Sequence, residues 1–330
     1  MRYLALSAVV LAALTQPALA DRDRHGHHDR GDRHSSHHDR GSRYHRGHDS
    51  NHEHDEPQQC EAPANPGNPD TPTTPSSDRL PILVVGASYG NGNVPFQTGL
   101  ESPLLGLAVN GGNYLSLGDA LIRSSLHNGY VINEAQASST TFTRESCRTA
   151  LYGGACSGAE FDGYDVQIQR AASRTYSLST GEFNADYVVI TAPNDCLHSD
   201  AFGIPEAETV ACDIEDMYDV AGRMIEAGMM AYALGMTPIY APYPPVEALD
   251  LDLFQTSSLL QWVISPEDYQ LLNDTVMGEI ANELPEALVV DYWANFTHLG
   301  DGIHPDVQTS ERAARTLMQA IQQHEVNPAL

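Results

Sequence analysis

Two short segments of this 330-residue sequence combine residue types that could act together in nucleophilic catalysis. Ser88 lies in the glycine-rich sequence GASYG, and Asp301 precedes His304 by three residues in the sequence LGDGIHPD. A carboxylate at this spacing can accept the proton of one imidazole nitrogen and leave the other nitrogen free as a base. A serine activated by such a base attacks acyl groups. His298 lacks a carboxylate at the same spacing, so His304 is the better candidate base.

The elements expected to position these segments are strands alternating with helices. Short apolar runs predict five strands, over residues 80–85, 130–132, 187–191, 238–241 and 287–290. This alternation favours a parallel sheet flanked by helices. Ligands of such sheets bind along the carboxyl edge of the strands. Because Ser88 follows the first predicted strand, the glycine-rich turn would present it at that edge.

Helix signals are strongest in the second half of the chain. Apolar residues recur at helical spacing between residues 213 and 234, which predicts a helix that ends before Gly235 and buries this stripe in the core. The stripe comprises Ile214, Met217, Tyr218, Ala221, Met224, Ile225 and Met229. Ser265, Pro266 and two following acids predict the start of another helix, which should end at Pro285. A helix-like stretch covers 115–126, and a last helix is expected over 310–323.

The GASYG turn also fits the G-x-S-x-G nucleophile elbow of α/β-hydrolases. In that fold the elbow usually follows several strands, whereas Ser88 follows the first predicted strand of this sequence. The position of Ser88 therefore favours a different hydrolase architecture.

Taken in order, Ser88, a central asparagine and the Asp-x-x-His sequence resemble the sequence blocks of SGNH (GDSL-like) hydrolases. The resemblance covers residues 80–323. It implies a three-layer α/β/α sandwich with a central, mostly parallel sheet, the flavodoxin-like SGNH hydrolase fold. It also implies cleavage of carboxylic esters by a Ser88, His304 and Asp301 triad through an acyl-enzyme, with no cofactor and no catalytic metal.

The same resemblance implies an oxyanion hole. The third block resembles YVVITAPND, which assigns the side-chain amide of Asn194 to the oxyanion. The second block resembles VINEAQASST, in which Ser138 stands at the position of the family's oxyanion glycine. The backbone N–H groups of Ser138 and Ser88 would then complete the hole. Any residue except proline can supply this donor. Gly112, in the competing sequence NGGN, is the alternative supplier, and Ser138 is preferred because it follows a predicted strand.

Three blocks depart from the family's usual pattern, the first at Ala87 and Tyr89, the second at Ser138 and the third at Ala192. The altered first block keeps a second hypothesis open, an exported metal-binding or adhesion protein whose hydrolase-like domain is catalytically inactive. A third hypothesis is an acyltransferase that uses the same residues with an alcohol in place of water.

The N-terminal region predicts export and a modular chain. Residues 1–20 have a positive charge, an apolar run and a final Pro-Ala-Leu-Ala, which together resemble a signal peptide. No apolar run is long enough to predict a transmembrane span, so we expect a secreted or periplasmic protein. Residues 21–56 are His-rich and too polar to fold alone, and residues 57–79 form a Pro/Thr/Ser-rich linker. The catalytic domain is expected over 80–330.

Export also changes the interpretation of the five cysteines, because disulfides persist in oxidising compartments. Spacing favours two local pairs, Cys147 with Cys156 and Cys196 with Cys212, the second of which would hold the loop after Asn194. Cys60 remains in the linker as a free thiol or a cross-link between chains. His198 is expected at the surface.

The formal net charge of −27 at pH 7 argues against nucleic acid and anionic membranes as partners. The expected substrate is instead a small-molecule or polymeric ester. Ten histidines lie between His25 and His54, and such tracts can bind divalent Zn, Ni or Cu weakly. The alternative for this tract is a solvated tail.

Overall fold

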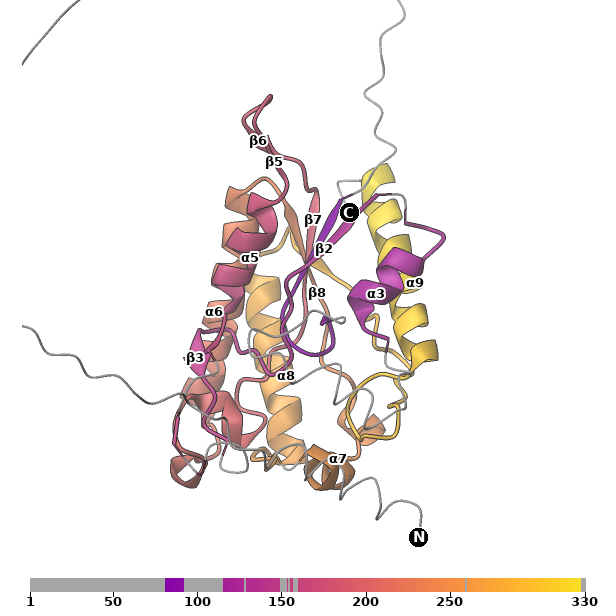
Figure 1. Ribbon diagram of the computed structural model, residues 1–330. Coiled ribbons are helices and arrows are strands. Elements are labelled where there is room, and N and C mark those ends of the chain that lie inside the picture. The colour runs from indigo at the N-terminus through magenta and orange to yellow at the C-terminus, as the bar shows by residue number, and fades with distance from the viewer. Residues whose placement is uncertain are drawn as a thin grey trace, which may run out of the picture. The chain divides into compact units, whose positions relative to one another are not determined.

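A five-stranded parallel sheet forms the centre of the part of the chain that the structure describes (Figure 1). The computed structural model describes residues 81–91, 115–127, 129–148, 153, 155–156, 160–258 and 260–327. The strands are ordered β2-β1-β7-β8-β9, and every neighbouring pair is parallel. In chain order this is the 2-1-3-4-5 arrangement of flavodoxin-like sheets. The five predicted strands are confirmed as β1 (Ile82–Val85), β2 (Val131–Asn133), β7 (Tyr187–Ile190), β8 (Thr237–Tyr240) and β9 (Leu288–Val289).

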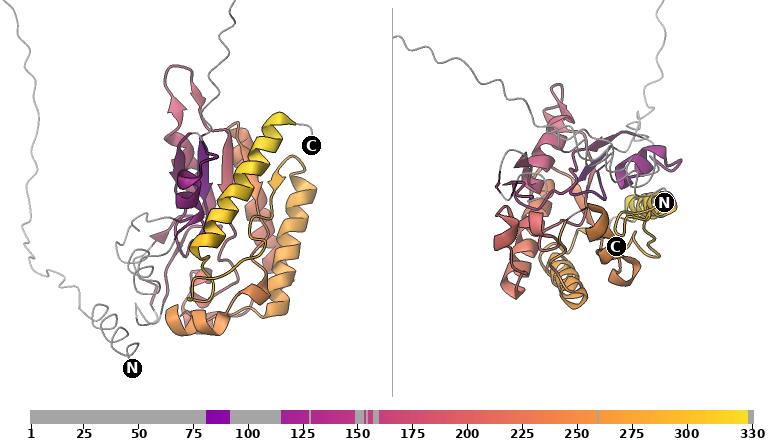
Figure 2. Two further views of the ribbon diagram at one scale, coloured as in Figure 1. Left: turned by 90° about the vertical axis from the view of Figure 1, so that its right-hand side faces the viewer. Right: turned by 60° about the horizontal axis from the view of Figure 1, so that its bottom comes forward.

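Helices cover both faces of the sheet, so the expected three-layer α/β/α sandwich is confirmed. Ile82 and Val84 of β1 belong to the core cluster on the side of α3 and α9, whereas Leu83 and Val85 belong to the cluster on the side of α5, α6 and α8. Figure 2 shows α9 lying along its face of the sheet. Because β1 is buried on both faces, every one of its residues is apolar. The helices are α3 (Leu117–Arg123), α5 (Tyr164–Ser173), α6 (Ile214–Ala233), α8 (Pro266–Glu283) and α9 (Val307–Val326).

Local capping fixes where the helices begin. Asp213 accepts from two backbone N–H groups at the start of α6, and Ser265 caps α8 with Pro266 in its first turn, as predicted. Asp306 accepts from the N–H of Thr309, so α9 begins at Val307 rather than at the predicted residue 310. α6 ends before Gly235, whose φ is +80°, a value that suits glycine.

The apolar stripe predicted for α6 is only partly core. Met217 and Met224 are buried, but Ile214, Tyr218 and Met229 are exposed, which corrects the prediction for these three residues. The buried face of α6 is centred instead on its small residues, including Val220, Ala227 and Ala231. Small side chains let a helix approach its neighbours closely, and the large residues Met217 and Met224 remain within this contact while Ile214, Tyr218 and Met229 fall outside it.

Shorter elements lie at the two ends of the sheet. Figure 1 shows α7 at the end opposite the β5–β6 hairpin. Among the described helices none is long and apolar enough to cross a membrane. The remaining elements are β3 (Arg144–Glu145) paired with β4 (Glu160–Phe161), β5 (Tyr176–Ser177) paired with β6 (Glu182–Phe183), α7 (Leu251–Ser258), and the 3-10 turns η1 (Ser199–Phe202), η2 (Glu206–Glu208) and η3 (Val246–Ala248).

Candidate active site

The turn that carries Ser88 directly follows β1 and is fixed by its backbone. Gly86 has a φ of +127°, and a Cβ there would lie 2.0 Å from the hydroxyl oxygen of Thr191, so only glycine fits. The N–H of Gly86 donates to the Gln167 side-chain oxygen over 2.7 Å, and the N–H of Ala87 donates to the Thr191 hydroxyl over 3.1 Å. Ser88 itself is half-buried. The turn therefore holds Ser88 at the carboxyl edge of the sheet, as the sequence predicts.

Asp301 and His304 are hydrogen-bonded to each other. The Nδ1 atom of His304 contacts Oδ2 of Asp301, while Oδ1 of Asp301 accepts from the backbone N–H groups of Ile303 and His304 over 3.1 and 3.0 Å. Burial raises the pKa of Asp301, but the His304 charge and these hydrogen bonds outweigh it and leave the pKa below its ordinary value. The buried carboxylate is thus held in its charged form and fixes the direction of the imidazole.

Aromatic rings connect the Ser88 turn to the imidazole. The ring centroid of Tyr89 lies 6.2 Å from that of His304 in an edge-on arrangement, and Phe254 of α7 lies 6.3 Å from His304. Tyr89 also packs against Trp293 and Phe296, with centroids 5.4 and 6.1 Å away. Burial and the Asp301 charge raise the pKa of the Tyr89 hydroxyl. The segment that carries Ser88 and the segment that carries His304 therefore meet in space.

Asn194 and Ser138 lie on two further loops that are bonded to each other. Asn194 follows β7, the strand beside β1, and donates from Nδ2 to the carbonyl oxygen of Ser139 over 3.0 Å. The buried Asp195 carboxylate accepts from the N–H of Thr141 over 2.8 Å and pairs with Arg223 over 3.2 Å. These bonds hold the segments of Asn194 and Ser138 next to each other. Because β7 runs parallel to β1, Asn194 and Ser88 follow their strands at the same edge of the sheet.

Ser138 adopts a backbone conformation that is typical of glycine. Its φ is +66°, in the left-handed region that few residues other than glycine occupy. The family glycine that resemblance assigns to this position would adopt the conformation without strain. The competing Gly112 lies outside the described residues, as does the rest of its segment.

Replacing Ser138 by glycine should retain any activity of the site and raise the free energy of unfolding by up to about 1 kcal/mol, because glycine relieves the left-handed strain. Ser138→Val should instead lower stability by about 1–3 kcal/mol, since a β-branched residue tolerates a positive φ poorly. Urea unfolding and ester assays of both variants check this. Loss of activity in a folded Ser138→Gly variant would show that the side chain, rather than the backbone N–H, has the important role.

Both predicted disulfides are confirmed. Cys147 is bonded to Cys156 and Cys196 to Cys212, with sulfur–sulfur lengths of 2.04 and 2.00 Å. The second bond begins two residues after Asn194, where Cys196 has a φ of +65°. It therefore links the Asn194 loop to the residue that precedes the cap of α6. Cys60 lies outside the described residues.

His198 is buried, contrary to the prediction that it lies at the surface. Only 3% of it is exposed, and it forms an isolated β-bridge with Trp262. Burial lowers its pKa to about 3, helped by the positive charges of Arg144 and Arg148. His198 therefore remains neutral and is buried where its segment meets that of Trp262. His298, the weaker candidate base, accepts a hydrogen bond from the Gly300 N–H through Nδ1.

Several contributors to the site were not identified from the sequence. Gln167, Thr191 and Phe254 contact the Ser88 turn or His304, yet their types and spacing carry no separate signal. Thr191 alone lies within a recognised block, where it immediately follows β7. Within the described ranges, no group of three or more His, Cys, Asp or Glu residues could hold a metal ion. The tract His25–His54 lies outside those ranges.

Solved structures similar to this chain include hydrolases of the class that the sequence blocks resemble. A carbohydrate acetylesterase from Sinorhizobium meliloti is 15% identical with a TM-score of 0.47, and the match covers 74% of this chain and 99% of that chain. A GDSL-like lipase from Bacteroides thetaiotaomicron is 12% identical with a TM-score of 0.39, covering 74% of this chain and 88% of that chain. No protein-family model and no curated protein matches the sequence. The functional argument therefore depends on the geometry of the site itself.

Proposed function

We propose that this chain is an exported serine esterase that cleaves carboxylic esters through an acyl-enzyme. Ser88 is the nucleophile, His304 the base and Asp301 the group that orients the imidazole. The observation that carries the proposal is the hydrogen-bonded Asp301–His304 pair beside Tyr89, the neighbour of Ser88 in the chain. Support also comes from topology, because Ser88 and Asn194 follow β1 and β7, the neighbouring strands at which the chain order of the sheet reverses. Ligands of open α/β sheets bind at this switch point.

The proposed reaction begins with proton transfer from the Ser88 hydroxyl to Nε2 of His304. The Ser88 oxygen attacks the ester carbonyl carbon, and the carbonyl electron pair moves to the oxygen. Collapse of this oxyanion breaks the bond to the alcohol, which leaves with the proton from His304. Water, deprotonated by His304, then releases the acyl group from Ser88 by the same steps.

The oxyanion would be bound by the backbone N–H groups of Ser88 and Ser138 and by the side chain of Asn194. An amide nitrogen carries two hydrogens. One is donated to the Ser139 carbonyl, which orients the group, and the other is assigned to the oxyanion. Donors fixed before the reaction stabilise the developing charge without reorganising during it.

Replacing Asn194 by alanine is expected to lower kcat by about 100- to 1000-fold, because one oxyanion donor is lost. Saturating nitrophenyl ester assays measure the effect. The matched control is Asn184→Ala, because Asn184 also donates to a carbonyl, that of Thr175, but precedes β7 at the opposite edge of the sheet. Unchanged turnover in a folded Asn194→Ala variant would remove Asn194 from the oxyanion hole.

The proposal is tested by assaying the mature chain against nitrophenyl esters from acetate to palmitate, with and without a chelator. Hydrolysis that the chelator leaves unchanged, together with a fluorophosphonate adduct mapped by mass spectrometry to the peptide that contains Ser88, is the expected result. Absence of hydrolysis across the series, or an adduct elsewhere, would contradict it. Retained acyl transfer to an added alcohol would favour the acyltransferase alternative. Metal binding without either activity would favour the inactive-domain alternative.

A further inference from the structure

The carbonyl oxygen of Ser138 is bonded to a buried guanidinium. Nη2 of Arg144, in β3, donates to this oxygen over 2.5 Å, and Nη1 of the same group forms an ion pair with Oδ2 of Asp200 over 3.5 Å. Only 1% of each of these two side chains is exposed. One arginine thus connects the proposed oxyanion loop to a fixed carboxylate in η1.

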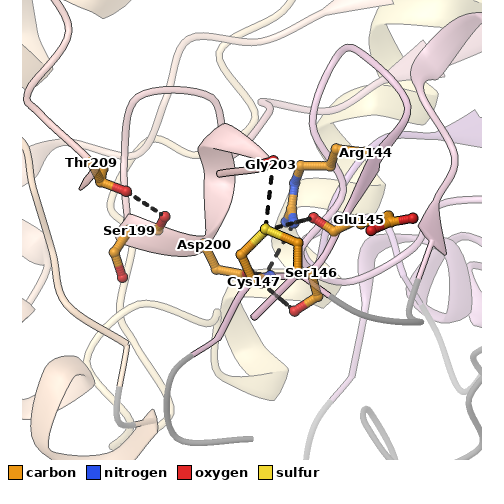
Figure 3. The surroundings of a disulfide bond; sticks show 9 residues. Arg144, Glu145, Ser146, Cys147, Ser199, Asp200, Gly203 and Thr209 are labelled. Carbon is orange, nitrogen blue, oxygen red and sulfur yellow. Dashed lines mark hydrogen bonds and ion pairs between the residues drawn. A yellow bond between two sulfur atoms is a disulfide. The ribbon is translucent and has the colours of Figure 1, made fainter. Parts of the chain in front are cut away.

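Asp200 is itself anchored on several sides, as Figure 3 shows. Its Oδ1 accepts from the N–H of Cys147 over 2.7 Å and from the hydroxyl of Ser146 over 3.0 Å. Cys147 is held in turn by its disulfide with Cys156. The Arg144 guanidinium lies over the ring of Phe161, 4.9 Å from the centroid. The position of the Arg144 side chain is therefore fixed by contacts that do not involve Ser138.

A buried ion pair of this kind needs a reason beyond stability. The cost of removing two charges from water often cancels their attraction, so buried pairs are weak contributors to net stability. The left-handed conformation of Ser138, with its φ of +66°, persists only where surrounding contacts determine it. The Arg144–Ser138 hydrogen bond supplies such a contact at the strained residue itself.

We propose that Arg144, anchored by Asp200, is a positioning residue that fixes the Ser138 backbone so that its N–H points at the oxyanion. This inference rests on the proposed function and deepens it. Arginine suits the role because its planar fork presents separate donors to the carboxylate and the carbonyl, whereas the lysine ammonium is a compact charge on a flexible stem.

The test compares Arg144→Lys with wild type, and uses Arg312→Lys as the matched control. Arg312 of α9 also donates to the carbonyl oxygen of a residue with a positive φ, Asn295, but both lie outside the segments that contain Ser138 and Asn194. Titration with a fluorophosphonate counts competent sites, so that kcat is expressed per titrated site. Arg144→Lys should lower this kcat by about 10- to 100-fold with little change in KM, as expected for a displaced donor. The affinity for a tetrahedral boronate should fall in parallel with kcat/KM, and the control should match wild type.

Fewer titrated sites or a lower melting temperature, with kcat per site and boronate affinity unchanged, would show a merely structural role and overturn the inference. If Arg144→Lys does not fold, Asp200→Asn replaces it, because the isosteric amide keeps an acceptor for Cys147 and loses the ion pair. This variant should show the same kind of change in kcat, and unchanged kcat would again overturn the inference.

The failure of this inference can be told apart from the failure of the proposed function. If hydrolysis depends on Ser88 but is unchanged in the Arg144 variant, only this inference is rejected. If the wild type shows no Ser88-dependent hydrolysis, the proposed function and the inference are both rejected.

Discussion

Replacing Ser88 by alanine is expected to reduce ester hydrolysis by at least about 1000-fold while leaving the fold intact. The loss follows because no acyl-enzyme can form without the hydroxyl oxygen. The fold should persist because the turn is held by other atoms. Gly86 and Ala87 donate to Gln167 and Thr191 through their backbone N–H groups, and alanine at position 88 leaves both bonds in place.

The measurement is kcat/KM with nitrophenyl acetate, alongside urea unfolding of the same preparation. The fluorophosphonate should also fail to label the variant. The matched control is Ser124→Ala, since Ser124 lies at the end of α3, where its hydroxyl accepts from Leu126. Equal rates for wild type and Ser88→Ala, with both proteins folded, would show that any hydrolysis observed does not use this serine.

The sheet could be predicted from the sequence because its strands contain short apolar runs, and two of them, β1 and β7, are buried throughout. The sequences of β1 and β7 are ILVV and YVVI, in which no charged or small polar residue interrupts the run. The two disulfides were predictable because each closes a short loop, of 9 and 16 residues' separation. Asp301 and His304 could be paired because three residues of loop bring them together without help from distant parts of the chain.

Features that depend on contacts between distant segments could not be predicted in this way. His198 resembles an ordinary loop histidine, but it is buried, and its segment bridges to Trp262, far along the chain. Arg144 resembles a surface charge, yet Asp200 and Ser138 meet it from two other segments. The buried side of α6 is likewise decided by its neighbours rather than by its own largest residues. Tertiary partners therefore determine the supporting contacts of the site, while local sequence determines the groups proposed to react.

Replacing Asp301 by asparagine is expected to lower kcat by about 10,000-fold, because an amide NH₂ can donate to Nδ1 of His304. The proton of the neutral imidazole would then reside on Nε2, and the base that should accept the Ser88 proton would be lost. The backbone N–H groups of Ile303 and His304 can still bond to the amide oxygen, so the loop should keep its shape. Turnover of nitrophenyl esters at neutral pH measures the effect.

The matched control is Asp306→Asn, the same substitution five residues further along the chain. Asp306 caps α9 by accepting from the Thr309 N–H, a role that asparagine fills equally well, so activity should be retained.

The contribution of Asp301 to the free energy of unfolding should depend on pH. Because the folded pKa of Asp301 lies below the ordinary 3.8, its carboxylate stabilises the fold above that value, and this contribution is lost as the pH falls through the folded pKa. The stability difference between wild type and Asp301→Asn should therefore be present above the ordinary value of 3.8 and shrink in strong acid. A wild-type rate in folded Asp301→Asn would mean that His304 needs no carboxylate partner, and that the proposed triad is wrong.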